Sequence, residues 1–110
     1  MSSQTENNIQ QVYDFLKKGD YETSSVVLSE LLENDLENPE ILFGIKCTAF
    51  WNARLSEVSE LTSLLSKGEQ LITNWKTFLS MIKEEKSNYE YFVYSLKKGV
   101  FTQILEIFQQ

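Results

Sequence analysis

Apolar residues recur every three or four positions along the first third of the chain and predict a helical hairpin. We expect a first helix over residues 6–18, because its last turn is basic and Gly19 can adopt the left-handed conformation that ends a helix. Asp20 is a good N-cap for a second helix, which should end near Asn34 and Asp35. The two apolar stripes are Ile9, Val12, Tyr13, Phe15 and Leu16, and then Val27, Leu28, Leu31 and Leu32.

A third helix is expected to begin at Pro39. Asn38 can cap this helix, and proline is tolerated at the first helical position because its missing N–H would have no partner there. Two apolar faces run along the segment. We expect one stripe to be buried, formed by Ile41, Leu42, Ile45 and Ala49, and an adjoining face to carry Phe43, Cys47 and Phe50.

The pattern that follows predicts one elongated helix. Eight positions alternate steps of three and four in a single phase: Val58, Leu61, Leu65, Gly68, Ile72, Trp75, Leu79 and Ile82. A turn at Gly68 would normally reset the phase, so we expect a continuous helix over residues 56–85, with Gly68 at a close helix crossing. The alternative is a loop at residues 66–68, because glycine inside a helix costs about 1 kcal/mol relative to alanine.

The end of the chain contains a short internal repeat. Residues 96–99 read Leu-Lys-Lys-Gly, the same four letters as residues 16–19. We therefore expect a turn at Gly99 and a third hairpin, whose last helix carries Ile104, Leu105 and Phe108. An apolar stripe left open at this end predicts the N-terminal fragment of a longer protein, or an end that docks on a partner.

The corner Gly19-Asp20-Tyr21, together with Asn38-Pro39 as the next helix opens, resembles the unit of the tetratricopeptide repeat (TPR) family. With Gly19 at the family's corner, the units start at Thr5 and Pro39, an offset that equals the 34-residue period of the family. The resemblance implies a single all-α domain over residues 1–110, with TPR-like antiparallel hairpins, about five or six helices and one elongated helix. The alternative is an unrelated helical bundle.

The match to the family is partial. Val12 and Lys46 stand where the family prefers a small residue in its first helix, and Val58 stands at such a position in the second unit's second helix. Leu36 replaces a frequent proline, and the second corner, residues 52–55, lacks a glycine.

The resemblance also implies a binding surface. First helices of successive TPR pairs line a concave groove, and the matching positions here are Ile9, Tyr13, Leu16, Phe43, Cys47 and Phe50. The family's clamp for acidic C-terminal peptides uses Lys, Arg and Asn, whereas this chain has Ile9, Tyr13 and Gly44, so that function is not implied. We expect an apolar partner helix or peptide instead, with contacts extended by Phe101, Ile104 and Phe108. The alternative is that the chain's own last helices cover the groove.

Composition and charge exclude several function classes. Of 110 residues, 42% are apolar and none is histidine, which removes histidine-based triads and metal sites. Residues 1–60 carry eleven acids against four bases, and no basic aromatic stripe follows, so nucleic-acid binding is not expected. The N-terminus lacks signal-peptide features and no stretch could span a bilayer, so we expect no membrane insertion and a cytoplasmic location.

No group of residues has the composition of a catalytic site. The carboxylates between Glu30 and Glu40 are expected to be solvated, and Cys47 has no histidine to activate it. We therefore expect no enzyme activity, no cofactor and no metal. The expected function is a protein-interaction scaffold or adaptor. The alternative is a purely structural or dimerisation domain, contacting further domains of its own polypeptide or a homodimer partner. The predicted core is Phe15, Leu28, Leu31, Leu42, Ile45, Ala49, Leu61 and Leu65.

Overall fold

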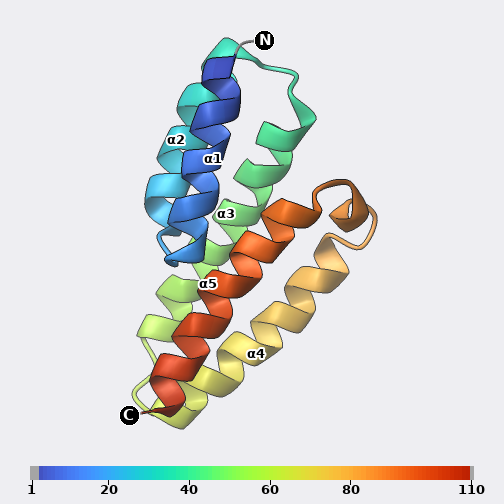
Figure 1. Cartoon of the computed structure of the whole chain (residues 1–110). Coiled ribbons are helices and arrows are strands. Elements are labelled where there is room, and N and C mark those ends of the chain that lie inside the picture. Colours follow the sequence, from blue (N-terminus) through green and yellow to red (C-terminus); the bar gives the residue numbers. More distant parts are fainter. Residues whose placement is uncertain (1–2, 110) are drawn as a thin grey trace.

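The computed structural model of the chain is helical throughout its secondary structure (Figure 1). It describes the backbone of residues 3–109 and the side chains of residues 8–109. Within that range there is no strand. The elements are α1 (Ser3–Lys17), α2 (Tyr21–Asn34), α3 (Pro39–Ser59), α4 (Leu64–Met81), a short 3-10 helix η1 (Lys86–Asn88) and α5 (Glu90–Phe108).

The corner between α1 and α2 has the predicted chemistry. Gly19 has φ = 79°, and the N–H of Asp20 donates to the carbonyl of Phe15 at 2.9 Å, which closes the end of α1. The carboxylate of Asp20 then accepts from the N–H of Thr23 at 3.1 Å and caps α2. Both predicted caps are confirmed. They could be predicted from the sequence because each depends only on neighbouring residues.

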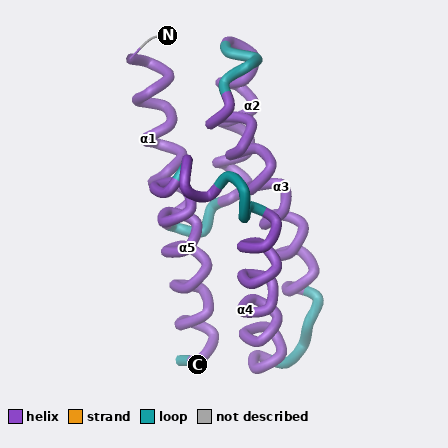
Figure 2. The backbone as a smooth tube through the Cα atoms, turned by 90° about the vertical axis from the view of Figure 1, so that its right-hand side faces the viewer, coloured by secondary structure: helices purple, strands orange, loops and turns teal. Residues whose placement is uncertain are grey.

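α3 connects the two ends of the molecule. It begins as predicted, with Pro39 at the first position and the side chain of Asn38 accepting from two backbone N–H groups. At 21 residues it is the longest helix. Its first half packs on α2 and its last part leads to α4, so α1 and α2 lie at one end and α4 and α5 at the other (Figure 2).

The expected helix over residues 56–85 is wrong at its start. α3 ends at Ser59, and after a turn the hydroxyl of Ser63 accepts from the N–H of Ser66 and caps a new helix. The break at residues 60–63 lets α4 turn back beside α3, which one straight helix through these residues would not allow. The elongated helix is therefore α3. α4 is continuous through Gly68, so the alternative of a loop at residues 66–68 is also wrong.

The expected turn at Gly99 is wrong as well. α5 runs without a break for 19 residues, and Gly99 lies inside it against the end of α1. A Cβ atom on Gly99 would lie 2.1 Å from the carbonyl oxygen of Leu16 and 3.2 Å from the backbone nitrogen of Gly19. The two Leu-Lys-Lys-Gly copies thus pack against each other: one ends a helix, and the other allows a helix crossing.

The core differs from the predicted list. Leu28 and Leu31 are buried, Phe15, Ile45 and Leu61 are partly buried, and Leu42, Ala49 and Leu65 are exposed. α3 turns its other apolar face inward, because α2, α4 and α5 enclose that side. The buried residues of α3 are Ile41, Phe43, Gly44, Cys47, Thr48, Trp51 and Val58.

Candidate interaction surfaces

The groove expected between α1 and α3 is filled by α5. The ring of Phe92 contacts the rings of Tyr13 and Phe43 edge to face, with centroid separations of 5.7 and 5.6 Å. A Cβ atom on Gly44 would lie 2.6 Å from the Phe92 ring, so the missing side chain of Gly44 makes room for it. Tyr89 stacks on Phe43 at 4.6 Å. The start of α5 therefore occupies the groove in which a partner helix or peptide was expected to bind.

Most of the expected partner-binding residues are inaccessible as a result. Five are buried: Ile9, Tyr13, Leu16, Phe43 and Cys47. Phe50 is half-buried, with its ring against Trp51 and Phe78 and the guanidinium of Arg54 over it at 4.8 Å. The prediction of a free groove is therefore wrong, because the apolar side chains of the groove pack against the chain's own helix α5. Phe101 and Phe108 are exposed, and their role in binding stays a prediction.

The groove residues have no reactive chemistry. The hydroxyl of Tyr13 donates to the carboxylate of Glu40, and burial together with this bond raises the pKa of Tyr13. Burial also raises the pKa of the Cys47 thiol, which Lys46 offsets only in part. A thiol held in its neutral form is a poor nucleophile. In the described part of the chain, no group of three or more acidic, cysteine or histidine side chains could hold a metal ion.

A different apolar surface is open to solvent on the hairpin of α4 and α5. We call it the outer α4–α5 face; it consists of Leu65, Ile72 and Leu79 of α4 and Phe101, Leu105 and Phe108 of α5. Leu65 and Leu105 expose 59% and 60% of their surface, and Phe108 exposes 49%. Leu79 is half-buried. Sequence reasoning assigned Phe101 and Phe108 to a docking end but placed Leu65 in the core.

Contacts between α4 and α5 hold this face together. The ring of Phe101 meets Trp75 edge to face at 5.6 Å. About two turns further along α5, the ring of Phe108 lies over Gly68, where a Cβ atom would come within 2.4 Å of it. Gly68 thus marks a close approach, as its sequence position suggested. The two helices run antiparallel side by side (Figure 1), and these two contacts bring the apolar side chains of α5 against α4.

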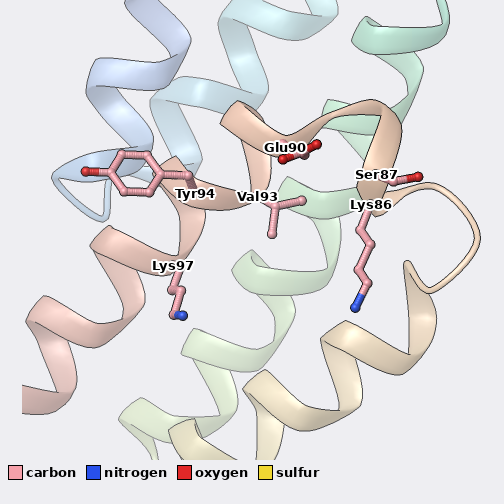
Figure 3. Close-up of a pocket in the computed structure, with 6 residues that line it drawn as sticks. All are labelled: Lys86, Ser87, Glu90, Val93, Tyr94 and Lys97. Atoms are coloured by element: carbon pink, nitrogen blue, oxygen red, sulfur yellow. The ribbon is translucent and has the colours of Figure 1, made fainter.

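A second surface, which sequence reasoning missed, lies at the start of α5. An open hollow of about 450 Å³ is lined by Lys86, Ser87, Glu90, Val93, Tyr94 and Lys97 (Figure 3). The side chains of Lys86 and Lys97 extend toward the same side of the hollow (Figure 3). The available signal was the three- and four-residue spacing of Glu90, Val93 and Lys97, which places them on one side of α5. Its charged groups are solvated, so the hollow can attract an acidic group but offers no desolvated acid or base.

Comparison of the chain with protein-family models, with curated proteins and with solved structures found no match. Among the described residues, no helix is both long enough and apolar enough to cross a membrane.

Proposed function

We propose that this chain is a non-catalytic protein–protein interaction module whose contact surface is the outer α4–α5 face. The observation that carries the proposal is the exposure of five large apolar side chains on one hairpin: Leu65, Ile72, Phe101, Leu105 and Phe108. Contiguous apolar patches on a soluble domain mark interaction sites more often than scattered single residues do. Aromatic side chains dominate the energetics of such interfaces, and burial of apolar surface is the main favourable term in association.

The TPR-like arrangement belongs to this proposal. Two features support it: the cap at Gly19 and Asp20, and the opening of α3 at Pro39, one 34-residue period after Thr5. In this view α1 with α2 and α3 with α4 are the two hairpins, and α5 is an added helix that fills the groove. The family's usual binding surface is then closed, and contact moves to the opposite side of the added helix.

A purely structural domain is the second candidate. The filling of the groove by Phe92 and Tyr89 favours it, because a closed groove leaves no site of the expected kind. The two candidates differ in what they predict for the outer α4–α5 face: the interaction module needs it, and the structural domain does not.

The test compares proteins captured by the purified chain from its source cell, using cross-linking and mass spectrometry. Three forms are used: wild type, Leu105→Glu on the face, and Val26→Glu, an equally exposed helical position on α2. We expect Leu105→Glu to reduce capture of specific partners, a second copy of the chain included, by at least about 10-fold, and Val26→Glu to leave it unchanged. Equal capture by all three forms would favour the structural domain.

A further inference from the structure

The outer α4–α5 face is spaced like one side of a helical bundle. Leu65, Ile72 and Leu79 lie seven residues apart on α4, which is the repeat of a coiled-coil seam. Phe101, Leu105 and Phe108 follow the steps of four and three that keep side chains on one side of α5. A surface with this spacing fits another pair of helices better than it fits an extended peptide.

The contacts between the two helices show which residues lie at the same height. Phe108 meets Gly68 and Phe101 meets Trp75, so Ile72 of α4 lies level with Ile104 of α5, one residue or about 1.5 Å from the level of Leu105. Leu65 and Leu79 are equally far from Ile72, seven residues on either side. Phe101 and Phe108 flank Leu105 at four and three residues. The apolar pattern is therefore close to symmetric about one level across both helices.

Two charged residues of opposite sign lie beside this apolar stripe on α4, one on each side of the level of Ile72. Glu69 lies three residues before Ile72 and Lys76 four residues after it, and both are exposed. On a helical wheel at 100° per residue they occupy the same flank of the apolar stripe. A two-fold rotation about the level of Ile72 would exchange their positions. Each glutamate of one copy would then face a lysine of the other.

We propose that two copies of this chain pack face to face through the outer α4–α5 face, about a two-fold axis near Ile72 and Leu105. In this dimer α4 runs antiparallel to α4 of the second copy. Leu65 lies near Leu79 of the partner subunit, and Glu69 pairs with Lys76 of the partner subunit. An isologous interface requires this kind of self-complementarity. The proposal rests on the proposed function, since it names the occupant of the same surface.

Sedimentation equilibrium of the full chain from about 1 µM to about 500 µM tests the dimer. We expect a reversible monomer–dimer equilibrium for wild type and for Val26→Glu. Leu105→Glu, which puts two carboxylates near the axis, should weaken the dimer at least about 30-fold. Circular dichroism and urea denaturation of each variant establish that it is folded.

Charge reversal gives the sharper result. Glu69→Lys and Lys76→Glu should each weaken the dimer by about 3- to 10-fold, because each creates like-charge contacts across the axis. The double variant Glu69→Lys/Lys76→Glu should restore wild-type association. Restoration is expected only when both residues meet each other across two copies. A double variant as weak as the single ones would overturn the proposed register.

Disulfide trapping tests the position of the axis. Leu105→Cys should form an intermolecular disulfide under mild oxidation, whereas Val26→Cys should not; the native Cys47 is buried and should not interfere. Wild type that stays monomeric throughout would overturn the dimer but leave the face open to another protein. A dimer insensitive to Leu105→Glu would overturn this inference, and unchanged capture in the lysate test would overturn the proposed function as well.

Discussion

Gly68 and Gly99 both lie where a Cβ atom would collide with a neighbour, but the colliding atoms differ in how far they can move. At Gly68 the neighbour is the end of the Phe108 side chain, which is half exposed and can rotate away. At Gly99 the neighbour is the backbone carbonyl of Leu16, held at the end of α1. The same residue type is therefore replaceable in one helix and required in the next.

Substituting these glycines by alanine should give opposite results. Gly99→Ala should lower the free energy of unfolding by about 1 to 3 kcal/mol, because α1 and α5 must separate to admit the methyl group. Gly68→Ala should leave it unchanged or raise it by up to about 1 kcal/mol, since alanine favours the helix and Phe108 can move. Urea denaturation measures both. Equal losses would contradict the assignment of the crowding atoms.

Two buried tyrosines allow a similar comparison. The hydroxyl of Tyr21 is buried without a hydrogen-bond partner, whereas that of Tyr13 donates to Glu40. Tyr21→Phe should therefore keep or raise the free energy of unfolding. Tyr13→Phe should lower it by about 1.5 to 3 kcal/mol, the range for a hydrogen bond to a charged group. Thermal and urea unfolding of both variants would check this. A large loss in Tyr21→Phe would mean that its hydroxyl has a partner after all.

At the scale of whole elements, helix starts were predictable and helix partners were not. The starts of α2 and α3 follow from Asp20 and Asn38, whose side chains act within three residues. The break before Ser63 was missed because Val58, Leu61 and Leu65 keep one helical phase by coincidence across a turn. The local signal for the break was Ser63, a residue type favoured at an N-cap, but the unbroken apolar phase outweighed it in the prediction.

The choice of buried face and the fate of the groove also lay beyond the sequence. α3 has two apolar faces, and the positions of α2, α4 and α5 decide that Phe43 and Cys47 are covered while Leu42 stays exposed. The groove residues were recognised correctly as an apolar line. Their occupant was predicted only as the alternative, in which the chain's own last helices cover the groove. The side chains that fill it, Tyr89 and Phe92, had not been assigned to it. The repeated four-residue motif suggested the same structure twice, but its surroundings differ.

The packing of α5 into the groove predicts a large effect for one side chain. Phe92 is buried between Tyr13, Phe43 and Gly44, so Phe92→Ala should lower the free energy of unfolding by about 3 to 5 kcal/mol. Tyr94→Ala on the same helix is the control; its ring is half exposed, and the change should be within about 0.5 kcal/mol. Similar losses for both would show that α5 is not anchored through Phe92.

On the scale of the whole molecule, the chain is elongated, with extents of 46 × 25 × 19 Å. Its first 60 residues are acidic by seven charges, from eleven acids and four bases, and include the loop between α2 and α3. The loop between α2 and α3 lies at one end of the molecule, and the hairpin of α4 and α5 reaches the other end (Figure 1). The hollow around Lys86 and Lys97 lies between these ends, because Tyr94, which lines it, packs against Lys17 at the end of α1. Repulsion between the acidic residues from Glu30 to Glu40 disfavours contact between two copies at that end. Association is therefore directed to the outer α4–α5 face.

Buried groups that ionise at high pH should make the whole molecule unstable in alkali. Burial raises the pKa of Tyr21, of Cys47 and of Tyr13. Each group is neutral when protonated, and the folded chain holds its proton at a pH where the unfolded chain has lost it. The free energy of unfolding should therefore fall as the pH rises past about 8.5 for the thiol and about 10 for the phenols.

Urea denaturation at about pH 7.5 and about pH 10.5 would measure this fall. The double variant Tyr21→Phe/Cys47→Ala should show a smaller difference between the two pH values than wild type does, whatever its stability at neutral pH. An equal difference would assign the alkaline effect to other groups.

The contact of Gly99 with Leu16 also bears on how fast the chain folds. It joins residues about 80 positions apart, whereas α1 with α2, and α4 with α5, meet through short connections. Closing so long a loop costs entropy before any packing is gained. We therefore expect the pairs α1–α2 and α4–α5 to form first, and α5 to dock on α1 after the transition state. Gly99→Ala should then accelerate unfolding while leaving the folding rate nearly unchanged, as stopped-flow kinetics would show. A slower folding rate would instead place this crossing in the folding nucleus.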